Sequence, residues 1–473
     1  MVIDEVANWK LEAKLEDNFR YFLQVAEVPK IESGARAYVI GRKGTGKTAI
    51  AEYLGGLSGL GTFSERLTFK NFPFNELYEF SQAGYSPANQ YIVLWKYIIY
   101  SFVCRMMAGN EAIDPRARSA LTKMYGKEPL ASLRRTLSGW TAKSFNIGLL
   151  GFSGGLELSN NAENLSWSDR VDILEDFLQK YLDSSTYFVL FDELDEDYRE
   201  ITNHDQHQRY TNLLTGLFKA VQDIRSVFRS KARLFPVVFL RDDLYALLID
   251  SDKNKWNDFK VELDWSEVEL RRLLAFRLTR AAHPNAARPM PFLDAWHMLF
   301  AGETVGVGNR DRRHIPIFDY ISRCTHLRPR DFVRYLQLCA EEAQSRGESH
   351  VSPEVVRYCE KAFSIHLRDE LVDEVHGLLP DIGSIFDLFS QIRKQELSIE
   401  EFYGAFAAQL QAGRLISSDP DFVLRALFYF SIIGNRPRQR LVTVFRYQNR
   451  DATLNFGEKI VPHRGLFKAL QIV

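Results

Sequence analysis

The chain has 473 residues, of which 46% are hydrophobic and 26% are charged, and its formal net charge is −1. A chain of this length is too long for one hydrophobic core, so we expect two to four domains. The near-neutral balance argues against a protein coated with nucleic-acid-binding charge but leaves room for a local basic patch. The four cysteines form no CxxC pair and no metal-ligand spacing with histidines, which is typical of buried thiols in a reducing cytoplasm.

The N-terminal stretch predicts one amphipathic helix that ends near Ser33 and leads into a first strand. It is acidic and has no apolar signal-peptide core. The most apolar run, Tyr91–Cys104, carries Lys96 in its middle and is too short to cross a bilayer comfortably. We therefore expect a cytoplasmic protein with no membrane partner, in which a buried helix covers about Asn89–Met107.

The sequence GRKGTGKT, from Gly41 to Thr48, lies between an apolar strand over Ala37–Ile40 and a helix over Ala49–Leu54. It fits G-x-x-x-x-G-K-[ST] at every fixed position. The glycines let backbone N–H groups curl around a phosphate, the lysine reaches the β- and γ-phosphates, and the threonine hydroxyl coordinates Mg²⁺. The alternative is an ordinary glycine-rich turn, but the strand–loop–helix context favours a phosphate cradle at a helix N-terminus. The predicted nucleotide-binding residues are Gly41, Lys43, Gly44, Thr45, Gly46, Lys47, Thr48 and Ala49.

Less informative segments follow this loop. A second strand is plausible over Arg66–Phe72. Between Thr141 and Ser159, glycines interleave with apolar residues, which indicates a β-hairpin or an insertion to which we assign no function. The next helix covers Trp167–Leu182, with Ser166 or Ser168 as its N-cap.

A wholly apolar strand, Tyr187–Phe191, ends in Asp192 and Glu193. Such a strand is buried on both faces of a parallel sheet, and ligands bind at the carboxyl ends of these strands. Asp192 is the candidate that holds Mg²⁺ with Thr48, and Glu193 is the candidate general base that polarises the attacking water. The acids at 195–197 fit helix capping or solvated charge better than further metal ligands.

A helix over about Arg209–Arg229 leads into another apolar strand within Leu234–Tyr245, where Arg241 precedes two aspartates. Arg241 is placed to sense a γ-phosphate, and the alternative is an ion pair with Asp242 or Asp243. A fifth strand covers Lys260–Trp265. The chain then enters a helix that reaches about Arg280, started by a capping box of Ser266 and Glu269. Repeated strand–helix alternation predicts an α/β fold with a doubly wound parallel sheet.

From about His283 to Ile365 we expect helices and no further strands. Pro329 lies in the first turn of one helix, with Arg328 and Arg330 at its N-terminus. Arginines there oppose the helix dipole, so they are candidates for a nucleotide contact. The alternative is a salt bridge to Asp331 or another acid.

The last hundred residues predict a winged helix: three helices, then two strands around a turn at Gln448–Asp451. The helices are expected over Asp381–Ile392, Ser398–Ala412 and Pro420–Ile433. Basic residues with interleaved aromatics suit a DNA phosphate backbone, and they equally suit a protein surface. The arginines concerned are Arg436, Arg438, Arg440, Arg446 and Arg450.

In this order, the motifs resemble those of AAA+/STAND-type P-loop ATPases, especially stand-alone prokaryotic members with a GRKGTGKTA loop and an FLRDD strand end, which often occur in phage-defence loci. They are more distantly similar to those of origin-recognition-type initiators, which share the lid and the winged helix. The resemblance covers most of the chain. It implies that Arg241 is the STAND-type arginine at the end of the sensor strand, and that Arg330 is the sensor-2 arginine brought to the γ-phosphate by the lid.

One departure concerns the segment before the fifth strand, where initiator ATPases place a trans-acting arginine. This chain has only Lys253 and Lys255 there. Their presence in place of an arginine argues against cooperative hydrolysis in a ring and favours a nucleotide switch.

The resemblance implies a P-loop ATPase core, an α-helical lid and a C-terminal winged-helix-like domain. The expected boundaries are 1–34 for a helical lead-in, 35–282 for the core with an insertion at about 110–165, 283–365 for the lid, and 366–473 for the winged helix.

The predicted function is an ATP-binding and ATP-hydrolysing switch with ATP and Mg²⁺ as cofactors. It would couple nucleotide state to a partner bound by the C-terminal domain: another protein, a second copy of the chain, or DNA. The predicted catalytic residues are Lys47, Glu193, Arg241 and Arg330. The alternative is a nucleotide-dependent DNA-binding protein with little turnover. A P-loop kinase is disfavoured because small kinases lack the lid and the winged helix.

Overall fold

The computed structural model describes residues 2–57, 59, 61–69, 87–126, 166–195, 204–229, 232–308, 313–438 and 442–472. The chain forms two compact units. The first unit comprises Met1–Leu23, Lys43–Thr45 and Trp265–Val473, and the second comprises Gln24–Arg42 and Gly46–Asp264. The glycine-rich stretch Thr141–Ser159 lies outside the described residues.

The second unit is built on a five-stranded sheet whose strands are all parallel. The strand order is β2-β3-β4-β1-β5. The strands are β1 (Tyr38–Gly41), β2 (Thr62–Thr68), β3 (Thr186–Asp192), β4 (Arg233–Arg241) and β5 (Lys260–Glu262). Every residue of β1 and β3 is buried, as their unbroken apolar sequences predict for strands covered on both faces.

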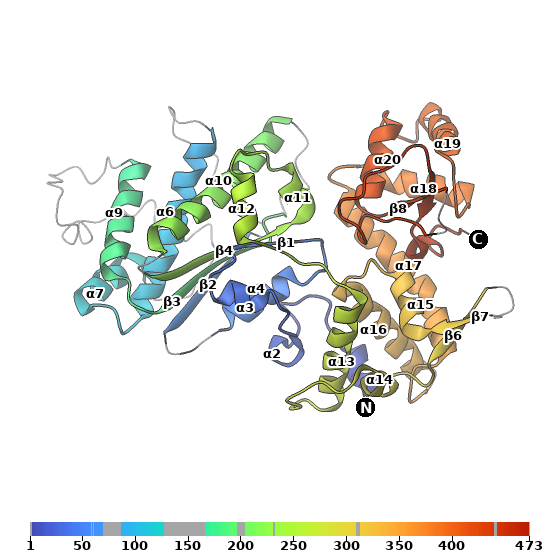
Figure 1. Ribbon diagram of the computed structural model, residues 1–473, viewed down its shortest axis with the longest axis horizontal. Helices are drawn as coiled ribbons and strands as arrows, with labels where there is room; N and C mark the ends of the chain where they lie inside the picture. The colour runs from blue at the N-terminus through green and yellow to red at the C-terminus, as the bar shows by residue number, and fades with distance from the viewer. Residues whose placement is uncertain are drawn as a thin grey trace. The chain divides into compact units, whose positions relative to one another are not determined.

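Helices cover both faces of this sheet. Figure 1 shows α6, α9 and α10 on one side and α4 on the other, which confirms the predicted doubly wound arrangement. The helices of this unit are α3 (Val28–Glu32), α4 (Lys47–Gly55), α6 (Pro87–Gly109), α7 (Pro115–Tyr125), α9 (Trp167–Tyr181), α10 (His204–Phe228), α11 (Asp242–Leu247) and α12 (Lys253–Trp256), followed by the short 3₁₀ helix η3 (Asn257–Phe259). Part of α6, Tyr91–Gly109, is long and apolar enough to cross a membrane, but most of it is buried in the core of this unit.

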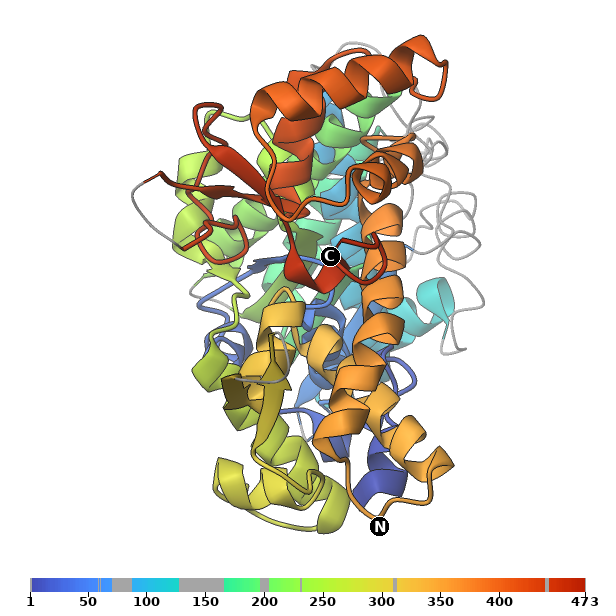
Figure 2. The same ribbon diagram turned by 90° about the vertical axis from the view of Figure 1, so that its right-hand side faces the viewer.

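The first unit is mainly helical. The helices that come before its C-terminal part are α1 (Val2–Ala7), α2 (Asn18–Tyr21), α13 (Glu267–Ala282), α14 (Phe292–His297), α15 (Ile317–Cys324), α16 (Pro329–Ser345) and α17 (Pro353–Val375). The predicted capping box of Ser266 and Glu269 starts α13. In Figure 2, α17 (orange) runs from these helices toward the C-terminal elements of the same unit and contacts both.

Two predictions for this unit are wrong. Strands do not stop after His283, because β6 (Thr304–Val307) and β7 (Arg313–Pro316) form an antiparallel pair that buries Val305 against the helices. The N-terminal stretch is also not one helix: α1, α2 and α3 are short and separate.

The N-terminal segment is broken because tertiary contacts override its helix propensity. Trp9 is buried, and the guanidinium of Arg277 lies 4.5 Å from the centre of its ring and 4.7 Å from that of Tyr21. Glu16 turns inward to form an ion pair with the same guanidinium. A continuous helix through these residues would not bring all three onto one arginine.

The C-terminal part of the first unit has three helices followed by an antiparallel strand pair, the predicted order of elements. They are α18 (Ile382–Ile392), α19 (Ile399–Gln411), α20 (Pro420–Tyr429), β8 (Ile433–Arg436) and β9 (Lys459–Pro462), followed by the 3₁₀ helix η5 (Arg464–Leu466). We call residues 382–472 the C-terminal module.

The predicted position of the strand pair is wrong. The first strand is the buried run at Ile433, and the predicted turn at Gln448–Asp451 lies in the connection between β8 and β9. The aromatic residues in this connection pack as rings: Phe445 and Tyr447 lie 5.0 and 5.5 Å from the ring of His463. Strand pairing in this connection is limited to one antiparallel bridge between Asn435 and Val444, and the rings pack beside it.

Candidate functional site

The loop between β1 and α4 has the backbone that its glycines predict. Gly44 has φ +81° and Gly46 has φ +99°, in the left-handed region that side chains other than glycine rarely adopt. Gly46 is the N-cap of α4 and supplies no side-chain cap, so the helix begins with its N-terminal amides uncapped by a side chain. Such a terminus favours an anionic ligand.

Lys47, the first residue of α4, folds back over this loop. Its Nζ donates hydrogen bonds to the carbonyl oxygens of Gly41 (2.7 Å) and Arg42 (2.9 Å). Burial lowers the pKa of Lys47 below its ordinary value, while the carboxylate of Asp195 opposes that shift. The amine is thus held at the mouth of the loop, where a phosphate would compete for it.

Thr48 faces the end of β3. Its Oγ1 lies 3.5 Å from Oδ1 of Asp192, a side chain that is 2% exposed. Burial, followed by the neighbouring carboxylate of Glu193, raises the pKa of Asp192 to about 6. Its other oxygen, Oδ2, makes no hydrogen bond within the described part of the chain, and Nη1 of Arg66 is 3.9 Å away. A hydroxyl beside a buried carboxylate with a spare oxygen fits Mg²⁺, which usually takes one or two carboxylates and completes its shell with water and phosphate.

Glu193 directly follows β3 and has φ +58°, so the extended backbone ends between the two acids. It lies close enough to Asp192 to raise the pKa of that carboxyl.

Arg241 ends β4, the strand between β1 and β3, and its side chain is 4% exposed. It makes a bidentate pair with Asp243, with Nε–Oδ1 and Nη2–Oδ2 distances of 3.0 and 2.6 Å, and its Nη1 lies 3.5 Å from Asp195. The ion pair that the sequence left open as an alternative is therefore present. Arg241 also lies near enough to Lys47 to influence its pKa.

The tip of the loop, Lys43–Thr45, belongs by its contacts to the first unit. The backbone N–H of Arg330 donates to the carbonyl of Gly44 (3.4 Å), and a Cβ on Gly44 would lie 3.1 Å from the Cβ of Arg330. The indole of Trp265 donates to the carbonyl of Thr45 (2.9 Å). Glycine at position 44 is thus required both by its φ and by the close approach of α16.

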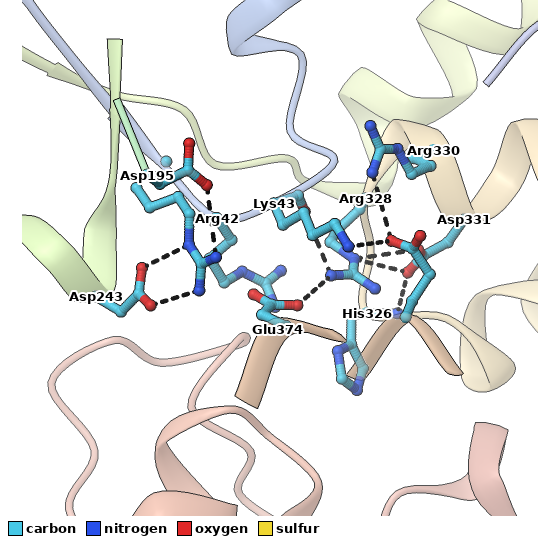
Figure 3. A network of polar contacts seen from close by, with 12 residues as sticks. Arg42, Lys43, Asp195, Asp243, His326, Arg328, Arg330, Asp331 and Glu374 are labelled. Carbon is cyan, nitrogen blue, oxygen red and sulfur yellow. Dashed lines mark hydrogen bonds and ion pairs between the residues drawn. The ribbon is translucent and has the colours of Figure 1, made fainter. Parts of the chain in front are cut away.

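Arg328, the N-cap of α16, is almost fully buried in a polar network (Figure 3). Its Nε donates to Asp331 (3.1 Å), and its Nη1 donates to the carbonyl of Lys43 (3.3 Å) and to Glu374 (3.2 Å). Burial opposes the charge, but Asp331 and Glu374 raise the pKa of Arg328 above its ordinary value. Its Nη2 is buried and makes no hydrogen bond to any residue in the described ranges.

Sequence reasoning missed the acids of α17 that take part in this network. Glu374 binds Arg328, and Glu370 binds both Lys43 (3.3 Å) and Arg330 (3.4 Å). The two glutamates are four residues apart and so share one helix face. That spacing is the only local signal for them, since their partners lie 40 residues or more away in the chain.

The arginines of the C-terminal module are largely engaged within it. Arg436 pairs with Glu396, and Arg438 donates to the carbonyl of Gly457 (3.3 Å). The guanidinium of Arg446 lies 3.7 Å from the centre of the Tyr429 ring. Arg450 is half-buried, and Arg440 lies outside the described residues.

Comparison with known proteins gives one partial family match and several distant structures. A family model described as the FunZ-associated C-terminal helical domain matches residues 269–372, which span α13 to α17. No curated protein sequence matches the chain.

Among solved structures, the Aeropyrum pernix ORC1 protein in complex with DNA is 14% identical, with 98% of this chain and 96% of that chain covered and a TM-score of 0.38. The Aeropyrum pernix ORC2 protein in ADPNP–ADP complexes is 13% identical, with 94% and 89% covered and a TM-score of 0.45. Cdc6p from Pyrobaculum aerophilum is 12% identical, with 92% and 86% covered and a TM-score of 0.31. The motif order predicted such distant similarities.

Proposed function

We propose that this chain is an ATP-dependent switch that binds Mg·ATP at Gly41–Ala49 and hydrolyses it slowly. The observation that carries the proposal is the arrangement at the carboxyl ends of β1 and β3. A loop with two left-handed glycines leads into α4, and Thr48 at its start faces the buried Asp192. Within this proposal the chain keeps the core, lid and C-terminal domain predicted from the sequence, although the predicted boundary at residue 365 falls inside α17 (Pro353–Val375).

Each residue has a defined task in the proposed reaction. Lys47 exchanges the carbonyl oxygens of Gly41 and Arg42 for the β- and γ-phosphates. Thr48 and Asp192 would hold Mg²⁺, which would neutralise charge on the phosphate oxygens. Glu193 orients a water molecule and accepts its proton as that water attacks the γ-phosphorus. The bond from phosphorus to the β,γ-bridging oxygen breaks, and ADP leaves with that oxygen.

Arg241 and Arg330 are proposed to detect the γ-phosphate. In the structure both are paired with carboxylates, Arg241 with Asp243 and Arg330 with Glu370. A γ-phosphate carries more negative charge than a carboxylate and would compete for both guanidiniums. Nη2 of Arg328, buried without a hydrogen bond to any described residue, is a further donor suited to a phosphate oxygen.

The contacts in the segment before β5 support the proposal that hydrolysis is slow and not cooperative within a ring. Lys253 donates to the carbonyl oxygens of Ala246 (3.2 Å) and Leu248 (2.7 Å), and Lys255 pairs with Asp252 (2.6 Å). Both lysines are thus held by contacts within their own segment.

We extend the proposal to antiviral defence. This extension rests on the resemblance of the GRKGTGKTA loop and the FLRDD strand end alone.

The partner of the C-terminal module is proposed to be a protein, either another chain or a second copy of this one. The ion pair of Arg436 and the ring contact of Arg446 favour a wing that packs on protein. DNA binding without significant turnover remains the second candidate, because a basic hairpin with interleaved aromatics also suits phosphates.

Calorimetric titration of the full chain with Mg·ATP tests the proposal. We expect wild type to bind and Lys47→Ala to lose binding while staying folded, since the lysine charge acts on phosphate and not on the core. Unchanged affinity in a folded Lys47→Ala protein would refute the phosphate-cradle assignment. Phosphate release measured with and without DNA then separates a switch with turnover from a DNA-binding protein without it.

A further inference from the structure

One carboxylate oxygen in the first unit serves two cations. Oε2 of Glu370 lies 3.3 Å from Nζ of Lys43, in the glycine-rich loop, and 3.4 Å from Nη1 of Arg330. Figure 3 shows the Lys43 and Arg330 side chains within the polar network around Arg328. All three side chains are partly buried, at 18–27% exposed. Water therefore weakens these two ion pairs less than it weakens an ordinary ion pair on the surface.

The charges around Glu370 keep it ionised. Burial alone raises the pKa of Glu370, but Lys43, Arg330 and Arg328 together lower it below its ordinary value. His366, one turn earlier on α17, is partly buried as well, and its pKa is lowered mainly by that burial. An ionised carboxylate thus occupies the position where two cations of the predicted phosphate site converge.

We propose that Glu370 is a positioning residue that holds Lys43 and Arg330 in place of a phosphate, and that ATP must displace it. The inference rests on the proposed function and adds to it a source of discrimination between ATP and ADP. Arg330 must exchange Glu370 for the γ-phosphate when ATP binds, so the Glu370 pair opposes ATP binding more than ADP binding. ADP, which lacks that group, leaves the Arg330–Glu370 pair in place.

The test is calorimetric titration of the full chain with Mg·ATP and with Mg·ADP, for wild type, Glu370→Gln, Arg330→Gln and the double variant. Glu370→Gln keeps the side-chain shape and removes the charge. We expect it to raise the preference for ATP over ADP by about three- to tenfold, the effect of removing a competing pair between partly buried groups. In the Arg330→Gln background the same change should leave that preference unaltered, because there is no guanidinium left to release.

The matched control is Glu342→Gln, which removes an ion pair (2.7 Å) between Glu342 of α16 and Arg346, the C-cap of that helix. It lies roughly 18 Å along the helix from Arg330, at about 1.5 Å per residue, so nucleotide preference should not change. Glu370→Asp, which keeps the charge on a shorter side chain, provides a second variant and should give a smaller gain than Glu370→Gln.

Two results would overturn the inference. An ATP preference that is equal in wild type, Glu370→Gln and Glu370→Asp would show that Glu370 does not compete with the γ-phosphate. A gain that persists in the Arg330→Gln background would show a general effect of charge and not of position. In either case, the proposed function would stand if ATP binding still depends on Lys47. A wild-type protein that binds no nucleotide would refute both the proposed function and the inference about Glu370.

Discussion

We predict that Asp192→Asn stabilises the nucleotide-free protein against unfolding at neutral pH. The same change should remove the dependence of nucleotide binding on Mg²⁺. Asp192 is 2% exposed, and its pKa of about 6 stands about two units above the ordinary value of 3.8. The folded state therefore binds the proton more tightly than the unfolded state does, so stability falls as pH rises from about 4 to about 6. At about 1.4 kcal/mol per unit, the ionised carboxylate costs roughly 3 kcal/mol above pH 6.

Differential scanning calorimetry in a chelator, between pH 4 and 8, measures this effect. Asparagine carries no charge at any of these pH values, so we expect the variant to melt higher than wild type at pH 8 and to lose that advantage near pH 4. For a unit of 150–250 residues, about 2–4 °C per kcal/mol is typical, so a shift on the order of 5–10 °C is expected at pH 8.

Asp258→Asn is the matched control, because Asp258 is exposed in the same unit and the chemical change is identical. Its melting temperature should follow that of wild type across the pH range. If Asp192→Asn melts below wild type at pH 8, or if its shift is independent of pH, the reasoning from burial is refuted. With Mg·ATP present, the order should reverse, because only wild type gains the ligand's stabilisation.

Three further outcomes are expected. Glu193→Gln should bind ATP normally but release phosphate roughly 10²-fold more slowly, and equal turnover in both proteins would assign the base elsewhere. Gly44→Ala should lower the melting temperature and weaken ATP binding. The φ of +81° and the Cβ of Arg330 at 3.1 Å leave no unstrained place for a methyl group. An unchanged affinity for ATP would show that the loop tip, Lys43–Thr45, does not touch the nucleotide. Because Arg436 and Arg446 make contacts within the C-terminal module, we expect no steeply salt-dependent binding of duplex DNA by the full chain. A slope of about −4.5 for the logarithm of the binding constant against the logarithm of salt concentration, at ~0.9 for each of five phosphates, would restore the DNA interpretation.

The parts of the fold that could be predicted are those specified by contiguous residues. The glycine-rich loop, the apolar strand that ends at Asp192, and the capping box at Ser266 all lie where the sequence predicted them. Each is stabilised by contacts within a few residues, or by burial on both faces, which leaves a direct mark on the sequence.

The parts that could not be predicted depend on residues far apart in the chain. Trp9, Tyr21 and Glu16 all converge on Arg277, more than 250 positions away, and this breaks the predicted N-terminal helix. Glu370 likewise reads as one acid among many on a long helix until α17 packs beside the loop tip. In both cases the partners lie too far apart in the chain for a sequence pattern to identify them.

The left-handed backbone of Glu193 has a consequence for the two-acid motif. Consecutive side chains on a strand point to opposite faces, so two adjacent acids on a continuing strand would be separated by the sheet. With φ at +58° the chain turns directly after Asp192, and the two carboxylates remain close enough for one to raise the pKa of the other. A non-glycine residue in this region stores about 1 kcal/mol or more of backbone strain. Glycine at this position would release that strain but would also remove the proposed base. The rest of the sheet must therefore hold Glu193 in its left-handed conformation.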